Sequence, residues 1–232
     1  MLLQPARRSL VEAGRRLDAA GMVIGTSGNL SVRVDELIVV SPSGRSLATL
    51  VEDDLVVIDS DGTLVDGLLT PTSETPLHLA IYGATDAIAI AHVHALDSTA
   101  LSCVQASRGT APEEPVAGRH QTGTDTLPAL HYTTVSLGGS VRVARYALYG
   151  TDELAANVVH AMRDGRVAAL MANHGSIAYG ETIEQACDRL ELLEWLCQLD
   201  ARAHAIGAPT PLTAEQLQTV ENKLQRTGYG QR

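Results

Sequence analysis

The sequence predicts one α/β domain over residues 1–232, with short strands in the middle of the chain and helices packed around them. The 232 residues are 45% hydrophobic, which is enough for one large core, and no repeat or linker divides them. Helical spacing of apolar residues marks both ends of the chain, whereas short β-type runs lie between them. Phenylalanine is absent, so the core must consist mainly of leucine, valine, isoleucine and alanine.

The N-terminal part of the chain predicts a helix followed by three strands. Leu10, Val11 and Leu17 have helical spacing, and Gly21 ends that pattern. The valine- and isoleucine-rich runs that follow are separated by short polar turns. The expected elements are a helix over 6–20, a hairpin of strands over 32–34 and 37–40, and a buried strand over 55–58.

The next expected helix begins within residues 71–76 and runs to about Tyr82. Thr72 or Ser73 is a suitable N-cap, and Pro76 fits the first turn. The elements expected after it are a strand over 87–94, a helix over 98–105 capped by Asp97, and a strand over 129–135.

The C-terminal third predicts mainly helix. Thr182 and Thr213 each stand three residues before a glutamine, which is the pattern of a capping box, and Gly207 closes the first of these helices. The expected elements are a helix from Thr151 or Asp152 to before Gly165, a buried strand over 167–172, a long helix from Thr182 to about Ile206, and a last helix from Thr213.

Residues 106–127 differ from the rest of the chain because they are polar and rich in turn formers. Segments of this kind lie on the surface. We therefore expect a surface insertion there, and we expect its His120 to be solvated rather than to act as a ligand.

Charge and hydropathy argue against several classes of partner. Seventeen basic and 27 acidic residues give a net charge of −10, and no basic run is present, so we expect neither nucleic acid nor a membrane as a partner. No apolar run reaches the roughly 18 residues of a membrane span, and the N-terminus lacks the order of a signal peptide. Cys103, Cys187 and Cys197 are scattered, which suits reduced core residues of a cytoplasmic protein.

Two histidines, His92 and His94, follow a short apolar run. In a strand, residues two apart point to the same face, so both imidazoles would face one metal ion. Many such pairs are ordinary core or surface histidines, and the metal interpretation therefore needs a third ligand. His174 can supply it, because it lies where a buried strand runs into Asn173 and Gly175.

Glu74 stands at the start of a predicted helix, behind two hydroxyl residues. An acid in the first helical turn is often there only because it suits the helix dipole. Alternatively, Glu74 is a carboxylate beside the metal, which fills the open position or acts as a general base.

Three turns are rich in glycine and hydroxyl residues, a composition that can bind phosphate through backbone N–H groups and hydroxyls. Each one alone would be an ordinary turn. They lie at residues 25–31, 41–44 and 72–73.

The motifs stand together in the order and approximate spacing of a known family. They are GTSGNLS (25–31), SPSG (41–44), TSE (72–74), HVH (92–94), PALHY (128–132) and NHG (173–175). Together they resemble the class II aldolase/adducin family, from about residue 6 to Tyr229. The members to which the chain is most similar cleave L-fuculose 1-phosphate. Segment 106–127, which those members lack, is the main departure.

The resemblance implies a central, mostly antiparallel β-sheet flanked by helices. It implies one Zn2+ per subunit, or another divalent metal, on His92, His94 and His174, with Glu74 as the fourth ligand or the acid/base. It also implies a homotetramer whose active sites lie between subunits, with Tyr132 reaching across as a catalytic acid and Tyr229 closing over the site. Without the resemblance, Tyr132 would be an aromatic residue packed at an interface. The implied phosphate-binding residues are Thr26, Gly28, Asn29, Ser43, Gly44, Thr72 and Ser73.

The implied activity is that of a metal-dependent aldehyde-lyase, which cleaves a ketose 1-phosphate reversibly to dihydroxyacetone phosphate and a small aldehyde. Lys223 is the only lysine and lies near the C-terminus, which disfavours an aldolase that works through a Schiff base.

Several alternatives stay open. A 5-deoxyribulose- or methylthioribulose-1-phosphate aldolase would differ only in the aldehyde half of its substrate. Sugar-phosphate 4-epimerases, dehydratases and decarboxylases share the fold, although the epimerases resemble one another in carrying aspartate at the position of Glu74. A binding module like the adducin head would have no use for an open three-histidine site. Four protein ligands with no exchangeable position would instead indicate a structural zinc.

Overall fold

The computed structural model describes residues 2–109 and 126–227, apart from the side chains of 105–109. The helices are α1 (Gln4–Ala19), α2 (Thr75–Ala84), α3 (Leu96–Gly109), α4 (Asp152–Ala161), α5 (Ile183–Ile206) and α6 (Ala214–Thr227). The strands are β1 (Asn29–Val34), β2 (Leu37–Val40), β3 (Val56–Asp59), β4 (Leu64–Asp66), β5 (Ala89–Val93), β6 (Thr126–Leu127), β7 (Val141–Ala144), β8 (Ala168–Met171) and β9 (Gly175–Gly180). The 3-10 helices are η1 (Leu47–Thr49), η2 (Glu52–Asp54) and η3 (Tyr132–Leu137).

All of these strands join one sheet, in the order β4-β3-β2-β1-β5-β9-β8-β7-β6. Each neighbouring pair is antiparallel except β7 and β8, which run parallel. This confirms the expected α/β class with a central, mostly antiparallel sheet. Because β5 is the middle strand of that order, the residues at its end have neighbours on both sides.

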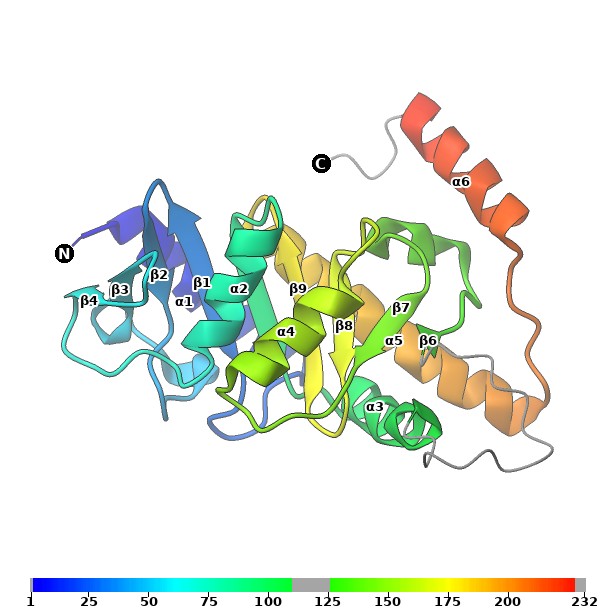
Figure 1. Ribbon diagram of the computed structural model, residues 1–232, viewed down its shortest axis with the longest axis horizontal. Coiled ribbons are helices and arrows are strands. Elements are labelled where there is room, and N and C mark those ends of the chain that lie inside the picture. The colour runs from blue at the N-terminus through cyan, green and yellow to red at the C-terminus, as the bar shows by residue number, and fades with distance from the viewer. Residues whose placement is uncertain (1, 110–125, 228–232) are drawn as a thin grey trace.

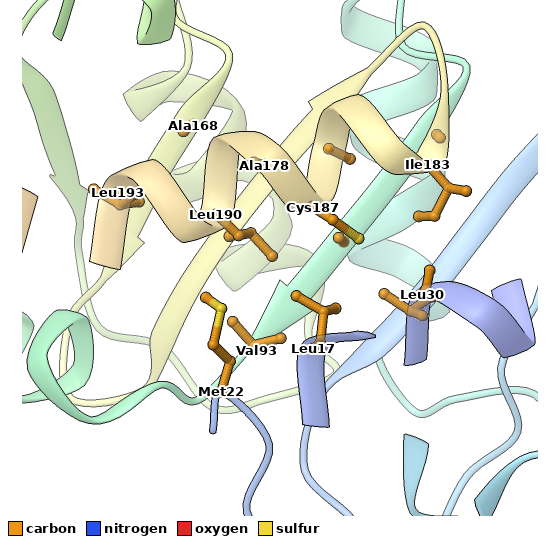
Figure 2. Packing of buried hydrophobic residues seen from close by; sticks show 14 of the residues in the cluster. Leu17, Met22, Leu30, Val93, Ala168, Ala178, Ile183, Cys187, Leu190 and Leu193 are labelled. Carbon is orange, nitrogen blue, oxygen red and sulfur yellow. The ribbon is translucent and has the colours of Figure 1, made fainter. Parts of the chain in front are cut away.

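Helices cover both faces of the sheet, which gives three layers (Figure 1). On one face, Leu17 of α1 and Leu190 of α5 belong to the same buried cluster as Val93 of β5, and Figure 2 shows this packing. On the other face, Ile81 of α2 and Val158 of α4 belong to a second buried cluster. Aliphatic side chains dominate both clusters, as the composition predicted, and α6 stands apart from the layers (Figure 1).

Side chains of β5 alternate between these two clusters. Ala91 and Val93 lie in the α1/α5 cluster, whereas Ile90 lies in the α2/α4 cluster. His92 follows the same alternation and therefore faces the α2/α4 side, with 0% of its surface exposed. Val93 therefore points into the α1/α5 core while His92, the residue before it, points the other way.

The predicted strand over 129–135 is wrong. Residues 132–137 instead form the 3-10 helix η3, in which the His131 side chain accepts a hydrogen bond from the Thr133 backbone and the Thr134 hydroxyl donates to the His131 carbonyl. Such local bonds offer the backbone an alternative to a strand ladder. Residues 64–66, 141–144 and 175–180 form β4, β7 and β9, three strands that were not predicted from the sequence.

Helix caps were predicted with mixed success. Thr151, Thr182 and Thr213 each accept a backbone hydrogen bond at a helix start, as expected. Asp97 is not the cap of α3, because the helix begins at Leu96 and a carboxylate of α5 binds its first N–H groups. The N-cap position of α2 is held by Glu74 rather than by Thr72 or Ser73.

Cys187 and Cys197 are buried and free, as expected, but Cys103 is exposed. Residues 110–125 of the predicted insertion, including His120, lie outside the described residues, and the insertion's ends belong to α3 and β6. Among the helices described, none is both long and apolar enough to cross a membrane.

Candidate active site

Four pieces of chain meet at one end of the sheet and bring the expected metal ligands together. β5 leads into His94, the turn between β8 and β9 carries His174, and α2 begins after Glu74. In the strand ladder, His92 of β5 pairs with Asn29, the first residue of β1. The sheet register therefore fixes the relative positions of the site residues.

The turn that carries His174 is tightly packed against β5. Asn173 has a positive φ of 54°, and Gly175 follows His174. A Cβ atom at Gly175 would lie 2.4 Å from the Val93 carbonyl oxygen and 3.0 Å from the His94 ring. Only glycine allows this approach, so Gly175 lets the turn that carries His174 pack directly against the end of β5.

The three histidines converge on one point. A ligand atom from each of His92, His94 and His174 lies within 4.8 Å of the others. The Nε2 atoms of His92 and His94 are 3.0 Å apart, and the three ring centroids are separated by 4.8–4.9 Å. Residues from two distant stretches of the sequence thus form a compact cluster of imidazole nitrogens.

Glu74 joins this cluster from the start of α2. Its Oε2 atom lies 3.1 Å from Nε2 of His92, and its Oε1 atom lies 3.4 Å from Nε2 of His174. The side chain is nearly buried, and the Asn29 amide donates a 2.8 Å hydrogen bond to Oε2. Oε1 is buried and accepts no hydrogen bond from the described residues.

The ring of His92 is oriented by the backbone of β9. Its Nδ1 atom lies 2.9 Å from the carbonyl oxygen of Ser176. Because a carbonyl can only accept, Nδ1 must donate, and the Nε2 atom is left to face the cluster. Hydrogen bonds of this kind are typical of metal-binding histidines.

Burial and neighbouring charges shift the pKa values of the four cluster side chains in different directions. Burial opposes ionisation of Glu74, but the charge and hydrogen bond of His92 outweigh it and hold the carboxyl pKa well below its usual range. Burial also opposes protonation of His92, but Glu74 and the Ser176 carbonyl outweigh it and raise the His92 pKa. Burial and the positive charge of His92 lower the pKa of His94 to about 3 and that of His174 to about 4.

These residues fit a divalent cation. Three imidazole nitrogens and one carboxylate oxygen are a ligand set that zinc accepts. His94 and His174 are neutral at pH 7, as ligands must be. The unpartnered Oε1 of Glu74 is a buried acceptor aimed at the same cluster, and a cation would satisfy it.

A chain of buried polar side chains lies behind Glu74. The Asn29 Oδ1 atom is 2.6 Å from Nε2 of His78, and Nδ1 of His78 is 2.7 Å from the Ser31 hydroxyl. That hydroxyl is 2.7 Å from the hydroxyl of Tyr82. Burial lowers the pKa of His78 to about 4, so its ring is neutral at pH 7.

These supporting residues were not predicted from the sequence, although one signal was available. Glu74, His78 and Tyr82 are spaced four apart, which places them on one face of a helix. Ser31 belongs to β1, and no local pattern links it to α2.

The glycine- and hydroxyl-rich turns lie beside this cluster. The Thr72 N–H donates to the Ser41 carbonyl, and the Ser43 N–H donates to the Thr70 carbonyl, so two of the expected backbone donors are already used. Thr26, Ser43, Gly44 and Ser73 are exposed. The carboxamide of Asn29 is held between Glu74 and His78.

Gly28 and Thr72 have structural roles at the edge of the cluster. A Cβ atom at Gly28 would lie 2.8 Å from the His92 carbonyl oxygen, and the residue has a positive φ of 86°. The Thr72 hydroxyl accepts a hydrogen bond from the Glu74 N–H. Both residues therefore help to place His92 and Glu74 of the cluster.

Of the two tyrosines predicted to act in catalysis, only Tyr132 lies within the described residues, and no contact between it and the histidine cluster is found there. Tyr132 lies in η3, is 47% exposed, and stacks on His131 with a centroid distance of 4.4 Å. Tyr229 and its neighbour Gly230 lie outside the described residues.

Comparisons with known proteins find related sequences and a related fold. The sequence profile of the class II aldolase and adducin N-terminal domain matches residues 8–201. The chain is 35% identical over 224 residues to a 5-methylthioribulose-1-phosphate/5-deoxyribulose-1-phosphate aldolase of Rhodospirillum rubrum, covering 96% of this chain and 92% of that protein. It is 33% identical over 224 residues to the L-fuculose phosphate aldolase of Escherichia coli strain K12, covering 95% and 94%. A solved structure of an L-fuculose 1-phosphate aldolase superposes with a TM-score of 0.85 at 33% identity, over 97% of this chain and 98% of that one.

Proposed function

Because the chain belongs to the class II aldolase and adducin family, we propose that it is a zinc-dependent aldolase that cleaves a ketose 1-phosphate to dihydroxyacetone phosphate and a small aldehyde. The observation that carries this proposal is the position of Glu74. Its carboxylate lies against two of the three converging histidines and has one oxygen without a hydrogen-bond partner. A binding scaffold has no need for such a group.

His92, His94 and His174 would hold one zinc ion, with Glu74 as a ligand that can leave. The bound cation would supply Lewis-acid stabilisation of the negative charge that develops on the sugar when the C3–C4 bond breaks. The histidines themselves bind and orient, and the Ser176 carbonyl keeps the His92 ring in place.

Glu74 is the proposed acid/base. Its depressed pKa keeps the carboxylate ionised at pH 7, as a base must be. In the direction of synthesis it takes a proton from C3 of dihydroxyacetone phosphate, while Tyr132 protonates the aldehyde oxygen. In cleavage the two proton transfers run in reverse.

The exposed turns would bind the substrate phosphate. The side chains of Thr26, Ser43 and Ser73 and the backbone of Gly44 remain as the proposed donors, because other N–H groups of these turns are already used. Phosphate binding would fix the non-reacting end of the sugar and so orient its reacting carbons.

The candidate substrates differ in the half of the sugar that is released as the aldehyde. L-fuculose 1-phosphate remains one candidate, and 5-deoxyribulose 1-phosphate and methylthioribulose 1-phosphate are supported equally by the relatives found. A dehydratase, 4-epimerase or decarboxylase of the same fold would use the same cluster differently.

We also propose that the active enzyme is a homotetramer with active sites between subunits. Tyr132 is exposed and has no described contact with the histidine cluster of its own chain. A neighbouring subunit would then present Tyr132 to that cluster, and Tyr229 would close over it.

A cleavage screen tests the proposed function. The zinc-loaded protein is incubated with the three candidate ketose 1-phosphates, and dihydroxyacetone phosphate and the released aldehyde are identified. Aldehyde release from at least one sugar is expected. Loss of water without cleavage would indicate a dehydratase, a new isomer would indicate an epimerase, and no turnover at full zinc content would favour a binding module.

A further inference from the structure

Four buried side chains extend from Glu74 into the space between the sheet and α2. In order they are Asn29, His78, Ser31 and Tyr82, at successive distances of 2.8, 2.6, 2.7 and 2.7 Å. His78 is 1% exposed and Ser31 is fully buried. No solvent-exposed group interrupts this series of contacts. The proposed mechanism gives Glu74 a role but none to these four side chains.

The direction of each hydrogen bond follows from the carboxylate. An ionised carboxylate only accepts, so the Asn29 Nδ2 atom donates and its Oδ1 atom faces His78. Oδ1 must then accept from Nε2–H of His78. The neutral ring has one donor, so its Nδ1 accepts from the Ser31 hydroxyl, which in turn accepts from the Tyr82 hydroxyl.

These hydrogen bonds orient the Asn29 side chain and do not transfer protons along the series. A carboxamide between Glu74 and His78 does not pass protons readily, because it would have to become an imidic acid. The hydrogen bonds fix the rotation of the Asn29 amide. Reversing that amide would place Oδ1 against the Glu74 carboxylate and Nδ2 against the donor of His78, which breaks two buried hydrogen bonds.

The fixed Asn29 amide gives the two carboxylate oxygens of Glu74 different environments. Asn29 ties Oε2, and Oε1 is left without a hydrogen bond from the described residues. On the basis of the proposed function, we infer that His78 is a positioning residue: acting through Asn29, it holds Glu74 so that Oε1 faces the metal and the substrate proton. Ser31 supports it by donating a hydrogen bond to the other ring nitrogen, Nδ1.

Substitutions at His78 test this role in the zinc-loaded enzyme. In His78→Leu the Asn29 Oδ1 atom loses the N–H group that donates to it. The rate of proton exchange at C3 of dihydroxyacetone phosphate should then fall on the order of 10- to 100-fold. The KM should stay nearly constant and the zinc content should stay at one per chain. His78→Gln, which can still donate to Asn29, should recover most of the rate, and His160→Leu in the exposed part of α4 is the matched control.

A double variant separates positioning from general damage. Asn29→Ala and His78→Leu act on the same contact, so the double variant should exchange no more slowly than Asn29→Ala alone. Losses that multiply, or a wild-type exchange rate in fully loaded His78→Leu, would overturn the inference.

A spectroscopic measurement decides the inference without turnover. In 15N-histidine-labelled holoenzyme, NMR should show His78 as the neutral Nε2–H tautomer, and Ser31→Ala should keep this tautomer because the Asn29 Oδ1 atom still needs a donor. An Nδ1–H tautomer in the wild type would overturn the inference. This measurement needs no variant, so it decides the inference even if His78→Leu does not fold. If the wild type catalysed no exchange at all, the proposed function would fail, whereas the tautomer would still decide whether His78 orients Asn29.

Discussion

Nε2 of His92 lies 3.1 Å from Oε2 of Glu74, and both side chains are nearly or fully buried. A buried carboxylate is costly unless it is paired or coordinates a metal. In this site it is paired with an imidazole whose other nitrogen is bound to the Ser176 carbonyl. The arrangement keeps the Glu74 carboxylate ionised and directs it at the place where three histidine nitrogens converge.

Zinc binding should release a proton from the metal-free protein. Glu74 and the Ser176 carbonyl raise the pKa of His92, yet the ring must lose its site-facing proton to bind zinc. The affinity for zinc should therefore increase as the pH rises toward the raised pKa of His92 and level off above it. Calorimetry in buffers of different ionisation enthalpy measures this proton, and a binding enthalpy independent of the buffer would contradict the assignment.

Acid should destabilise the metal-free protein partly through His78. Its pKa is about 4 in the fold and 6.5 in the unfolded chain, so between these values the unfolded chain binds more protons and stability falls as the pH is lowered. The shift corresponds to about 3 kcal/mol at most. Urea unfolding of EDTA-treated protein at pH 6.5 and pH 4 should show a smaller loss in His78→Gln than in the wild type. Equal losses would show that His78 does not stay neutral.

A methyl group at Gly175 should disturb the metal site. Its Cβ would lie 2.4 Å from the Val93 carbonyl and 3.0 Å from the His94 ring, so Gly175→Ala should cost about 1–3 kcal/mol of unfolding free energy and weaken zinc binding. Gly83→Ala in α2 is the control, because no atom lies within 4 Å of its added Cβ. Full zinc affinity in Gly175→Ala would mean that the turn around His174 yields without moving the ligands.

Replacement of Tyr132 by phenylalanine should reduce cleavage by about 100-fold or more, because cleavage then lacks the group that takes the proton from the C4 hydroxyl. Because the side chain is 47% exposed, zinc content and stability should not change. If Tyr132 acts across a subunit interface, mixing Tyr132→Phe with Glu74→Gln subunits should restore roughly a quarter of the activity by random pairing. No recovery from such mixtures, with exchange of subunits verified, would contradict the shared site.

Much of the metal site could be predicted from the sequence because its ligands sit in local patterns. The two histidines of the His-x-His motif follow a buried run, and His174 stands beside a glycine at a strand end, so periodicity and turn chemistry located all three. Glu74 was found because it follows two hydroxyl residues at a helix start. The structure confirms that these four side chains meet.

The supporting residues could not be predicted in the same way. Ser31 meets His78 only because β1 lies next to β5 in the sheet and under α2, a tertiary relationship that no spacing in the sequence encodes. The cap of α3 was missed for the same reason, since the carboxylate that provides it, Glu194, belongs to α5. At residues 129–135 strand propensity was overruled by hydrogen bonds between side chains and the local backbone.

Proton exchange at C3 of dihydroxyacetone phosphate tests the central claim most directly. Zinc-loaded wild-type enzyme in deuterated water should exchange one C3 hydrogen without any aldehyde present. Glu74→Gln should retain a zinc ion on its three histidines and lose this exchange by about 100-fold or more, because the amide cannot accept the proton. Exchange at the wild-type rate in zinc-loaded Glu74→Gln would show that Glu74 is not the base.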